Sequence, residues 1–172
     1  MRTRLATTPL LSAFALFVAL SSGVAAQGLG LPIGTQLPEF TLHTLDGKEV
    51  AIGEVVPPGK PALVEIWASW CEICEALQPQ LDEIAGTWGD EVNVVAIAVS
   101  VAQSERRVRR HVEDAGHPYT YLWDGDGAGV RALNAATTGI VMIFDADGRV
   151  VYAGSGRNQD LVGEIRKVLG KG

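Results

Sequence analysis

The chain contains two cysteines, Cys71 and Cys74, and only two residues separate them. A disulfide stabilises a fold mainly by closing a loop of the unfolded chain, and its effect grows with the length of that loop. A bridge across so short a loop would be a poor structural crosslink. The remaining roles for the cysteine pair are redox chemistry and metal binding. Two thiols at this spacing can form and break a disulfide reversibly.

The residues around the pair predict a buried β-strand followed by a helix. Residues 62–67 are apolar apart from one glutamate, as in a strand that is covered on both faces. Residues 71–86 predict a helix that Gly86 is expected to end. One face of this helix is apolar and consists of Ile73, Leu77, Leu81 and Ile84.

This placement assigns roles to the two thiols. In the first turn of a helix the sulfurs come within bonding distance, and the free amides and the helix dipole favour a thiolate. Cys71 is therefore the expected nucleophile, and Cys74 is expected to resolve the mixed disulfide that forms. Glu72 and Glu75 flank the pair and should oppose ionisation of Cys71, which favours reduction of substrates over their oxidation. Together with Ile73, they are the candidate modulating residues.

Glu65 lies inside the apolar run that leads to the cysteines. Burial disfavours the charged form of a carboxyl group, so the pKa of Glu65 is expected to be raised. We expect Glu65 to take and return the proton of Cys74 during exchange. The alternative is a core acid whose carboxyl group is satisfied by a hydrogen bond.

Strands and helices alternate along the rest of the chain. Further strands are predicted at residues 39–43, 49–52, 92–99, 119–122, 140–144 and 150–152. Further helices are predicted at residues 104–116 and 161–170. Because the chain ends with a hairpin and a helix after alternating elements, we expect an α/β sandwich with a mixed sheet.

The N-terminal residues 1–26 have the pattern of a cleaved signal peptide. Two arginines precede an apolar stretch at residues 10–20, and small residues follow up to an expected cleavage site after Ala26. An uncleaved membrane anchor is the alternative, although a spanning helix needs about 20 apolar residues. Residues 27–36 are expected to be a loose lead-in and residues 37–172 the folded domain. Export would place this domain in the periplasm or elsewhere outside the cytoplasm.

Composition excludes other classes of function. The formal net charge of −6 leaves no basic surplus for phosphates, so nucleic acid is not an expected partner. The two cysteines and three scattered histidines fall short of a zinc-ligand set, and no cofactor is expected. Four arginines at residues 106, 107, 109 and 110 are interpreted as a solvated helix surface, with docking to an acidic partner as the alternative.

The segment from Lys60 to Cys74 resembles the active-site segment of thioredoxin-like proteins, most closely that of the exported thiol–disulfide oxidoreductases of the TlpA, ResA and CcmG group. Residues 38–48 resemble the N-terminal hairpin of this group, and residues 145–151 resemble its late hairpin. The resemblance covers residues 33–169. It implies a thioredoxin-like three-layer sandwich with a mixed central sheet and an extra N-terminal β-hairpin. It also implies protein disulfides as substrates, an upstream thiol electron donor and transient contact with a membrane protein.

Two residues depart from the pattern of this group. Glu65 stands where the group often has asparagine, whereas thioredoxins and protein disulfide isomerases have an acid there. Gly139 stands where the family has a cis-proline facing the cysteines, and no proline follows Pro118. Because a cis bond before a non-proline residue costs about 2.5–4 kcal/mol, the Thr138–Gly139 peptide is expected to be trans. Thr138 and Gly139, with Trp70, are the candidate substrate-binding residues, in a loop of altered shape.

Two other functions are weighed against disulfide exchange. Peroxide reduction is not expected, because Val64 and Ala68 stand where related peroxidases have the proline and threonine of a PxxxTxxC motif. The competing class is a non-catalytic thioredoxin-like scaffold that binds a metal ion or a protein partner. The leading hypothesis is an extracytoplasmic thiol–disulfide oxidoreductase that reduces protein disulfides.

Overall fold

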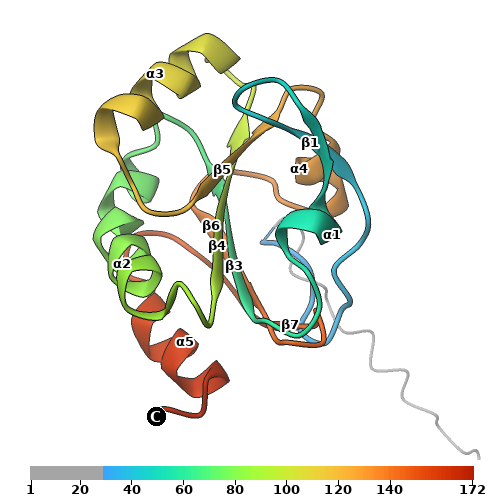
Figure 1. Cartoon of the computed structure of the whole chain (residues 1–172), viewed down its shortest axis with the longest axis vertical. Coiled ribbons are helices and arrows are strands. Elements are labelled where there is room, and N and C mark those ends of the chain that lie inside the picture. Colours follow the sequence, from blue (N-terminus) through green and yellow to red (C-terminus); the bar gives the residue numbers. More distant parts are fainter. Residues whose placement is uncertain (1–28) are drawn as a thin grey trace, which may run out of the picture.

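The computed structural model describes residues 29–172, so the predicted signal peptide lies outside the described range. Within this range seven strands and five helices follow one another (Figure 1). The strands are β1 (Thr41–Thr44), β2 (Glu49–Ala51), β3 (Ala62–Trp67), β4 (Asn93–Val99), β5 (Thr120–Asp124), β6 (Ile140–Phe144) and β7 (Val150–Ser155). The helices are α1 (Ile52–Val55), α2 (Glu72–Trp88), α3 (Glu105–Ala115), α4 (Ala128–Ala132) and α5 (Leu161–Val168).

The strands form one mixed sheet in the order β2-β1-β5-β4-β3-β6-β7. β3, β4 and β5 are parallel to one another, and β6 runs antiparallel to β3. Every residue of β3 is buried, because this apolar strand has a neighbour on each side and cover on both faces. β3 therefore carries the chain from the centre of the molecule directly to the cysteine pair.

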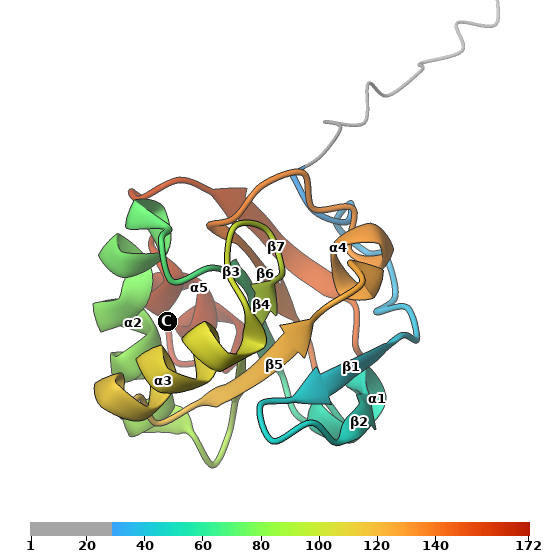
Figure 2. The same ribbon diagram turned by 90° about the horizontal axis from the view of Figure 1, so that it is seen from above.

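Helices cover both faces of the sheet (Figures 1 and 2). α2, α3 and α5 lie on one face, and α1 and α4 lie on the other. α2 joins β3 to β4 and α3 joins β4 to β5, so both connections step the same way across the sheet. Since such crossovers are right-handed, their helices must share a face. This arrangement confirms the predicted three-layer α/β sandwich with a mixed central sheet.

The predicted N-terminal hairpin is present and extends the sheet. β1 and β2 pair antiparallel with Leu42 opposite Val50, and β1 also pairs with β5. The preceding segment is held against β7, since Gly34 N–H donates to the Val150 carbonyl at 2.7 Å and Val150 N–H donates to the Thr35 carbonyl at 2.9 Å. The described part of the predicted lead-in is thus anchored to the domain rather than loose.

Two differences from the predicted elements have simple physical causes. The sequence predicts that α2 ends at Gly86, but the helix continues to Trp88. Gly86 is exposed and a Cβ there would meet nothing within 4 Å, so no close contact forces the helix to stop. The short helices α1 and α4 are not predicted, because four or five residues are too few for a periodic pattern. No helix in the described part of the chain combines the length and apolarity needed to cross a membrane.

Candidate active site

Cys71 and Cys74 are joined by a disulfide where β3 gives way to α2. Their Cα atoms lie 5.2 Å apart, within the range of about 4.4–6.8 Å usual for a disulfide. Between strand and helix the chain makes a tight turn, in which Cys71 N–H donates to the Ala68 carbonyl at 3.0 Å. The strand–turn–helix context predicted for the pair is therefore present.

The sulfur of Cys71 lies at the N-terminus of α2. Cys71 is the N-cap of the helix, and Cys74 N–H donates to its Sγ at 3.1 Å. When the disulfide opens, this amide and the positive end of the helix dipole stabilise negative charge on Sγ. Cys71 is 7% exposed and Cys74 is 1% exposed, so Cys71 carries the sulfur that a partner can reach.

Two acidic side chains lie in the same helical turn. Glu72 and Glu75 are both exposed. Glu72 Oε2 lies 4.0 Å from Arg157 Nη2, but both side chains are mostly in solvent. Because exposed ion pairs of this kind are weak, the negative charge next to Cys71 is only slightly compensated.

Glu65 projects from β3 into the interface beneath α2. Its register partner Val141 and its strand neighbour Leu63 form one apolar cluster with Leu77 of α2. Residues that pair, or that lie two apart in a strand, share a face of the sheet, so Glu65 faces the same helix. Cys74 lies three residues before Leu77 and points to the same side of α2.

The carboxyl group of Glu65 has unusual surroundings. Glu65 is 1% exposed, and its Oε1 has no hydrogen-bond partner within residues 29–172. Burial raises the pKa of Glu65 to about 8, as the sequence predicts. The alternative of a core acid satisfied by hydrogen bonds does not apply to Oε1.

Tyr121 of β5 and Tyr119, which lies just before this strand, belong to this interface. Glu65 pairs with Ala96, which pairs with Tyr121, so Glu65 and Tyr121 share a face across one small residue. The Tyr121 hydroxyl donates to the Tyr119 hydroxyl at 3.0 Å. Burial is the main cause that raises the pKa of both phenols, and the charge of Glu65 contributes. The phenols therefore stay neutral at physiological pH.

The loop before β6 meets the cysteine pair at Gly139. The Thr138–Gly139 peptide is trans, as predicted, and Gly139 has a φ of 75°. A Cβ at this position would lie 2.5 Å from Ile73 Cγ2 and 3.9 Å from Cys71 Sγ. Gly139 N–H also donates to the Ile66 carbonyl at 2.8 Å. The loop is therefore close to Cys71 and Ile73, and glycine is needed for its backbone angle and its contact with Ile73.

Trp70 lies beside Cys71, and a hydrogen bond holds its side chain in place. Trp70 is 43% exposed, and its Nε1–H donates to the Val101 carbonyl at 2.8 Å. Gln103 strengthens the same contact, because its side chain accepts from Ser69 N–H at 2.9 Å and donates to the Val99 carbonyl at 2.6 Å. The exposed indole is thus held in place from the loop after β4.

Two hollows of about 200 Å³ each share Trp70 as a lining residue. The first has a mixed polar and apolar lining, which includes Cys71, Glu72, Glu75, Gln78 and His111. The second is mainly apolar and its lining includes Ile66, Val99, Val101, Val130 and Thr138. Trp70 and Thr138, two of the predicted substrate-binding residues, therefore lie on one surface, and Cys71 lies on the surface next to it.

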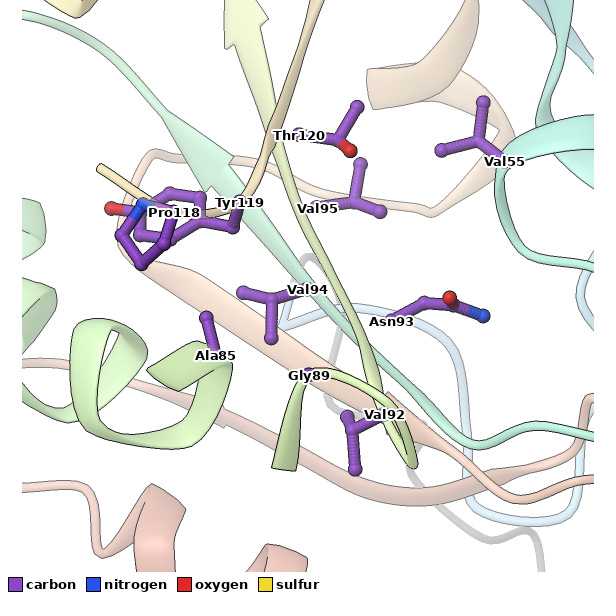
Figure 3. Close-up of a pocket in the computed structure, with 10 residues that line it drawn as sticks. All are labelled: Val55, Ala85, Gly89, Val92, Asn93, Val94, Val95, Pro118, Tyr119 and Thr120. Atoms are coloured by element: carbon purple, nitrogen blue, oxygen red, sulfur yellow. The ribbon is translucent and has the colours of Figure 1, made fainter. Parts of the chain in front are cut away.

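A further hollow, of about 140 Å³, lies at the opposite end of β4 around Asn93 and Tyr119 (Figure 3). Its lining residues include no cysteine and no carboxylate. This hollow is therefore no part of the disulfide site.

The remaining candidate residues lie on the surface or apart. Arg106, Arg107 and Arg110 are exposed on α3, and Arg109 pairs with Glu105 at 2.8 Å. Among the residues that the structure describes, no group of three or more His, Cys, Asp or Glu side chains is arranged to hold a metal ion.

Sequence reasoning does not nominate Gln103 or Gln159, although both bind backbone groups of distant segments at the site. A single glutamine in a loop gives no periodic or motif signal. Only the tertiary structure shows which backbone groups it meets.

Comparisons with known proteins agree with this site. The family model described as Redoxin matches residues 32–169. The "Thioredoxin-like protein YneN" of Bacillus subtilis (strain 168) is 29% identical over 116 residues, which are 66% of this chain and 67% of YneN. The "Thiol:disulfide interchange protein DsbE" of Escherichia coli (strain K12) is 25% identical over 126 residues, which are 72% of this chain and 65% of DsbE. The chain thus spans about two thirds of the length of these relatives.

A solved structure shows the same fold. The MTB protein dsbF was solved in its mixed oxidized and reduced forms and is 25% identical to this chain, with a TM-score of 0.65. The match covers 82% of this chain and 100% of dsbF. The cysteine pair lies within the region that the family model matches. The chain therefore belongs to the Redoxin family, as a thioredoxin-like protein of the TlpA, ResA and CcmG type.

Proposed function

We propose that this protein is a thiol–disulfide oxidoreductase that works outside the cytoplasm and reduces disulfides of partner proteins. One observation carries the proposal: Cys71 caps α2, receives the Cys74 amide on its sulfur and stays reachable from solvent. The name of the relative DsbE, a thiol:disulfide interchange protein, supports the chemistry. The signal-like pattern of residues 1–26, outside the described range, supports export.

The reaction starts from the reduced protein. The Cys71 thiolate attacks one sulfur of a partner disulfide, a Cys71–partner bond forms, and the other partner sulfur leaves as a thiolate. Cys74 then gives up its proton and attacks Cys71 Sγ, which releases the second partner sulfur. The partner gains two electrons, and the protein is left with the Cys71–Cys74 disulfide seen in the structure. A separate dithiol donor, reached through a membrane protein, restores the reduced form.

Glu65 is the proposed acceptor of the Cys74 proton. Cys74 is buried, so bulk water reaches its thiol poorly, whereas Glu65 faces the same side of the interface. The raised pKa of Glu65, about 8, is close to the value of about 8.5 for an ordinary thiol. A carboxyl group whose pKa lies near the working pH can both accept and return a proton.

The direction of electron flow follows from the charge at Cys71. Glu72 and Glu75 disfavour the thiolate, and a protein with a less stable reduced form is a stronger reductant. We expect a potential nearer to that of thioredoxin, about −270 mV, than to that of DsbA, about −120 mV. Equilibration with glutathione buffers measures it, and an oxidising value would overturn the reductive direction while leaving exchange chemistry intact.

Turnover is tested by insulin reduction with dithiothreitol as electron donor. The wild-type protein should accelerate the reaction, and Cys71→Ser should not. Equal rates for the two proteins would contradict the proposal and favour the non-catalytic scaffold. Cys74→Ala should accumulate mixed disulfides with its partners, because the resolving thiol is absent. Export is tested separately, since protein recovered from the periplasm should begin at Gln27 by mass spectrometry.

A further inference from the structure

Gln159, in the loop between β7 and α5, is a buried polar residue whose side-chain NH₂ group donates two hydrogen bonds. It is 8% exposed. Its Nε2 donates to the Gly139 carbonyl at 3.2 Å and to the Gly156 carbonyl at 2.8 Å, and its Oε1 accepts from the Tyr152 hydroxyl at 3.1 Å. Because each end of the amide faces a group of the opposite kind, its orientation is fixed.

These bonds continue the sheet where the strand pairing stops. The β6–β7 register starts with Ile140 opposite Ser155, and the next residues outward are Gly139 and Gly156. A buried carbonyl without a partner is costly, so the buried Gly139 carbonyl needs a donor, and the partly buried Gly156 carbonyl shares the same amide. The two hydrogens of one side-chain amide serve both carbonyls and tie the ends of β6 and β7 together.

The backbone of Gln159 is tied to the cysteine helix. Gln80 of α2 donates from Nε2 to the Gln159 carbonyl at 2.8 Å, and Gln80 Oε1 accepts from Leu161 N–H at 2.8 Å. Gln159 therefore links the end of β6 to α2, the element that carries Cys71 and Cys74.

Gly139 is thereby held from two sides. Its N–H is bound to the Ile66 carbonyl on β3, and its carbonyl is bound to Gln159. A Cβ on Gly139 would lie 3.9 Å from Cys71 Sγ, so any movement of this residue changes the space beside the reachable sulfur. Proline would fix its own backbone angle, whereas glycine does not, so the loop depends on these external bonds.

We infer that Gln159 is a positioning residue that holds the Thr138–Gly139 loop at its distance from Cys71 and thereby sets how a protein disulfide reaches that sulfur. The inference rests on the proposed function. A small disulfide needs only the exposed edge of Cys71, whereas a polypeptide must also fit the surface formed by Trp70 and Thr138. Loosening the loop should therefore weaken the binding of a protein substrate and leave the reactivity of Cys71 unchanged.

The test compares two glutamines whose side chains contact opposite ends of the β6–β7 hairpin. Gln159→Met keeps the side-chain length and removes the three bonds. Gln36→Met is the matched control, because Gln36 Nε2 also bridges two carbonyls, those of Asp147 and Gly148, at the other end of β6 and β7. Gln159→Met should raise the KM for insulin about tenfold, as expected for the loss of buried hydrogen bonds, with kcat and the rate with hydroxyethyl disulfide within about twofold. Gln36→Met should leave all three quantities near their wild-type values.

Three outcomes separate this inference from the proposed function. If the wild-type protein reduces insulin but Gln159→Met has an unchanged KM, only the inference fails. If Gln159→Met slows insulin and hydroxyethyl disulfide equally, its role is general stability and the inference is also overturned. If Gln159→Met does not fold, Tyr152→Phe is tested in its place. It removes the hydroxyl that donates to Gln159 Oε1, so the side-chain amide is no longer held in one orientation, and the KM for insulin should rise by a smaller factor.

A measurement without turnover covers the case in which the wild type is inactive. Hydrogen exchange of the Gly139 amide, followed by NMR in the oxidised protein, reports directly on the loop. It should be about tenfold faster in Gln159→Met and unchanged in Gln36→Met. Equal exchange in both variants would overturn the positioning role.

Discussion

Ile73 and Gly139 pack so closely that the side chain of one excludes a side chain on the other. A Cβ on Gly139 would lie 2.5 Å from Ile73 Cγ2 and 3.0 Å from Ile73 Cβ. Ile73 stands between the two cysteines, and Gly139 is the last residue of the loop before β6 that faces Cys71. An aliphatic side chain on the helix and a bare backbone on the loop thus fill the space beside Cys71.

This packing predicts coupled effects on stability. Gly139→Ala should lower the free energy of unfolding by about 1–3 kcal/mol, because alanine is strained at a φ of 75° and its methyl group meets Ile73. Ile73→Ala opens that space, so Gly139→Ala should cost less in its presence, with a coupling of about 0.5–3 kcal/mol. Urea unfolding of the four oxidised proteins measures the coupling. Strict additivity would show that the two residues do not compete for space.

The fold was largely predictable because its central segments carry strong local signals. The bounds of β3 and β6 follow from apolar runs, interrupted in β3 only by Glu65, and α3 begins after the Ser104 cap and ends at Gly116 as predicted. A helix end at Gly86 was not correct, since glycine in an exposed helical position costs stability without stopping the helix. Local patterns therefore fix elements better than their ends.

Sequence reasoning predicted those site residues whose type and position already suggest their chemistry. Cys71, Cys74 and Glu65 stand out because thiols at this spacing and an acid in an apolar strand are rare. Gln159 and the contact between Ile73 and Gly139 do not stand out, because they depend on which distant segments the sheet brings together. The second group consists of common residues in loops or on a helix.

Glu65 predicts a specific dependence of stability on pH. Its carboxyl group has a pKa of about 8 in the folded protein against 4.5 for an unperturbed glutamate, so the folded state holds a proton that the unfolded state releases. The free energy of unfolding should therefore fall as the pH rises from about 4.5 to about 8, and then level off. Oxidised protein is used, so the cysteines do not titrate.

The control for this prediction is Glu65→Gln, which has no proton to lose. The difference in unfolding free energy between wild type and Glu65→Gln should change across this pH range, even if other groups titrate in both proteins. A difference that is constant from pH 4.5 to 8 would show that the pKa of Glu65 is not raised.

Gly86 and Gly116 both have room for a Cβ but differ in backbone angle, so replacing each by alanine should change the stability in opposite directions. A Cβ at Gly86 or at Gly116 would meet nothing within 4 Å. Gly86 lies inside α2, so Gly86→Ala should raise the free energy of unfolding by about 0.5–1 kcal/mol through the lower entropy of the unfolded chain. Gly116 caps α3 with a φ of 67°, so Gly116→Ala should lower it by about 1–2 kcal/mol. Changes of the same sign in thermal or urea unfolding would contradict the prediction.

The acidic residues in the first turn of α2 predict how the redox potential can be shifted. Removing one exposed charge next to Cys71 stabilises its thiolate, and with it the reduced form. Glu72→Gln or Glu75→Gln should therefore lower the pKa of Cys71 and make the potential about 5–20 mV less negative, since exposed charge pairs are worth about 0.2–1 kcal/mol and 30 mV corresponds to about 1.4 kcal/mol.

Electrostatic origin is tested by position and by salt. Glu83 is also exposed on α2 but lies two to three turns further along the helix, so Glu83→Gln should leave the potential unchanged. Glutathione equilibration at low salt and at about 1 M salt, where the screening length falls to about 3 Å, should show the shift shrinking in Glu72→Gln and Glu75→Gln. A shift that persists at high salt, or that Glu83→Gln reproduces, would mean that the potential is set by the backbone amides at the cap of α2 and not by its acidic turn.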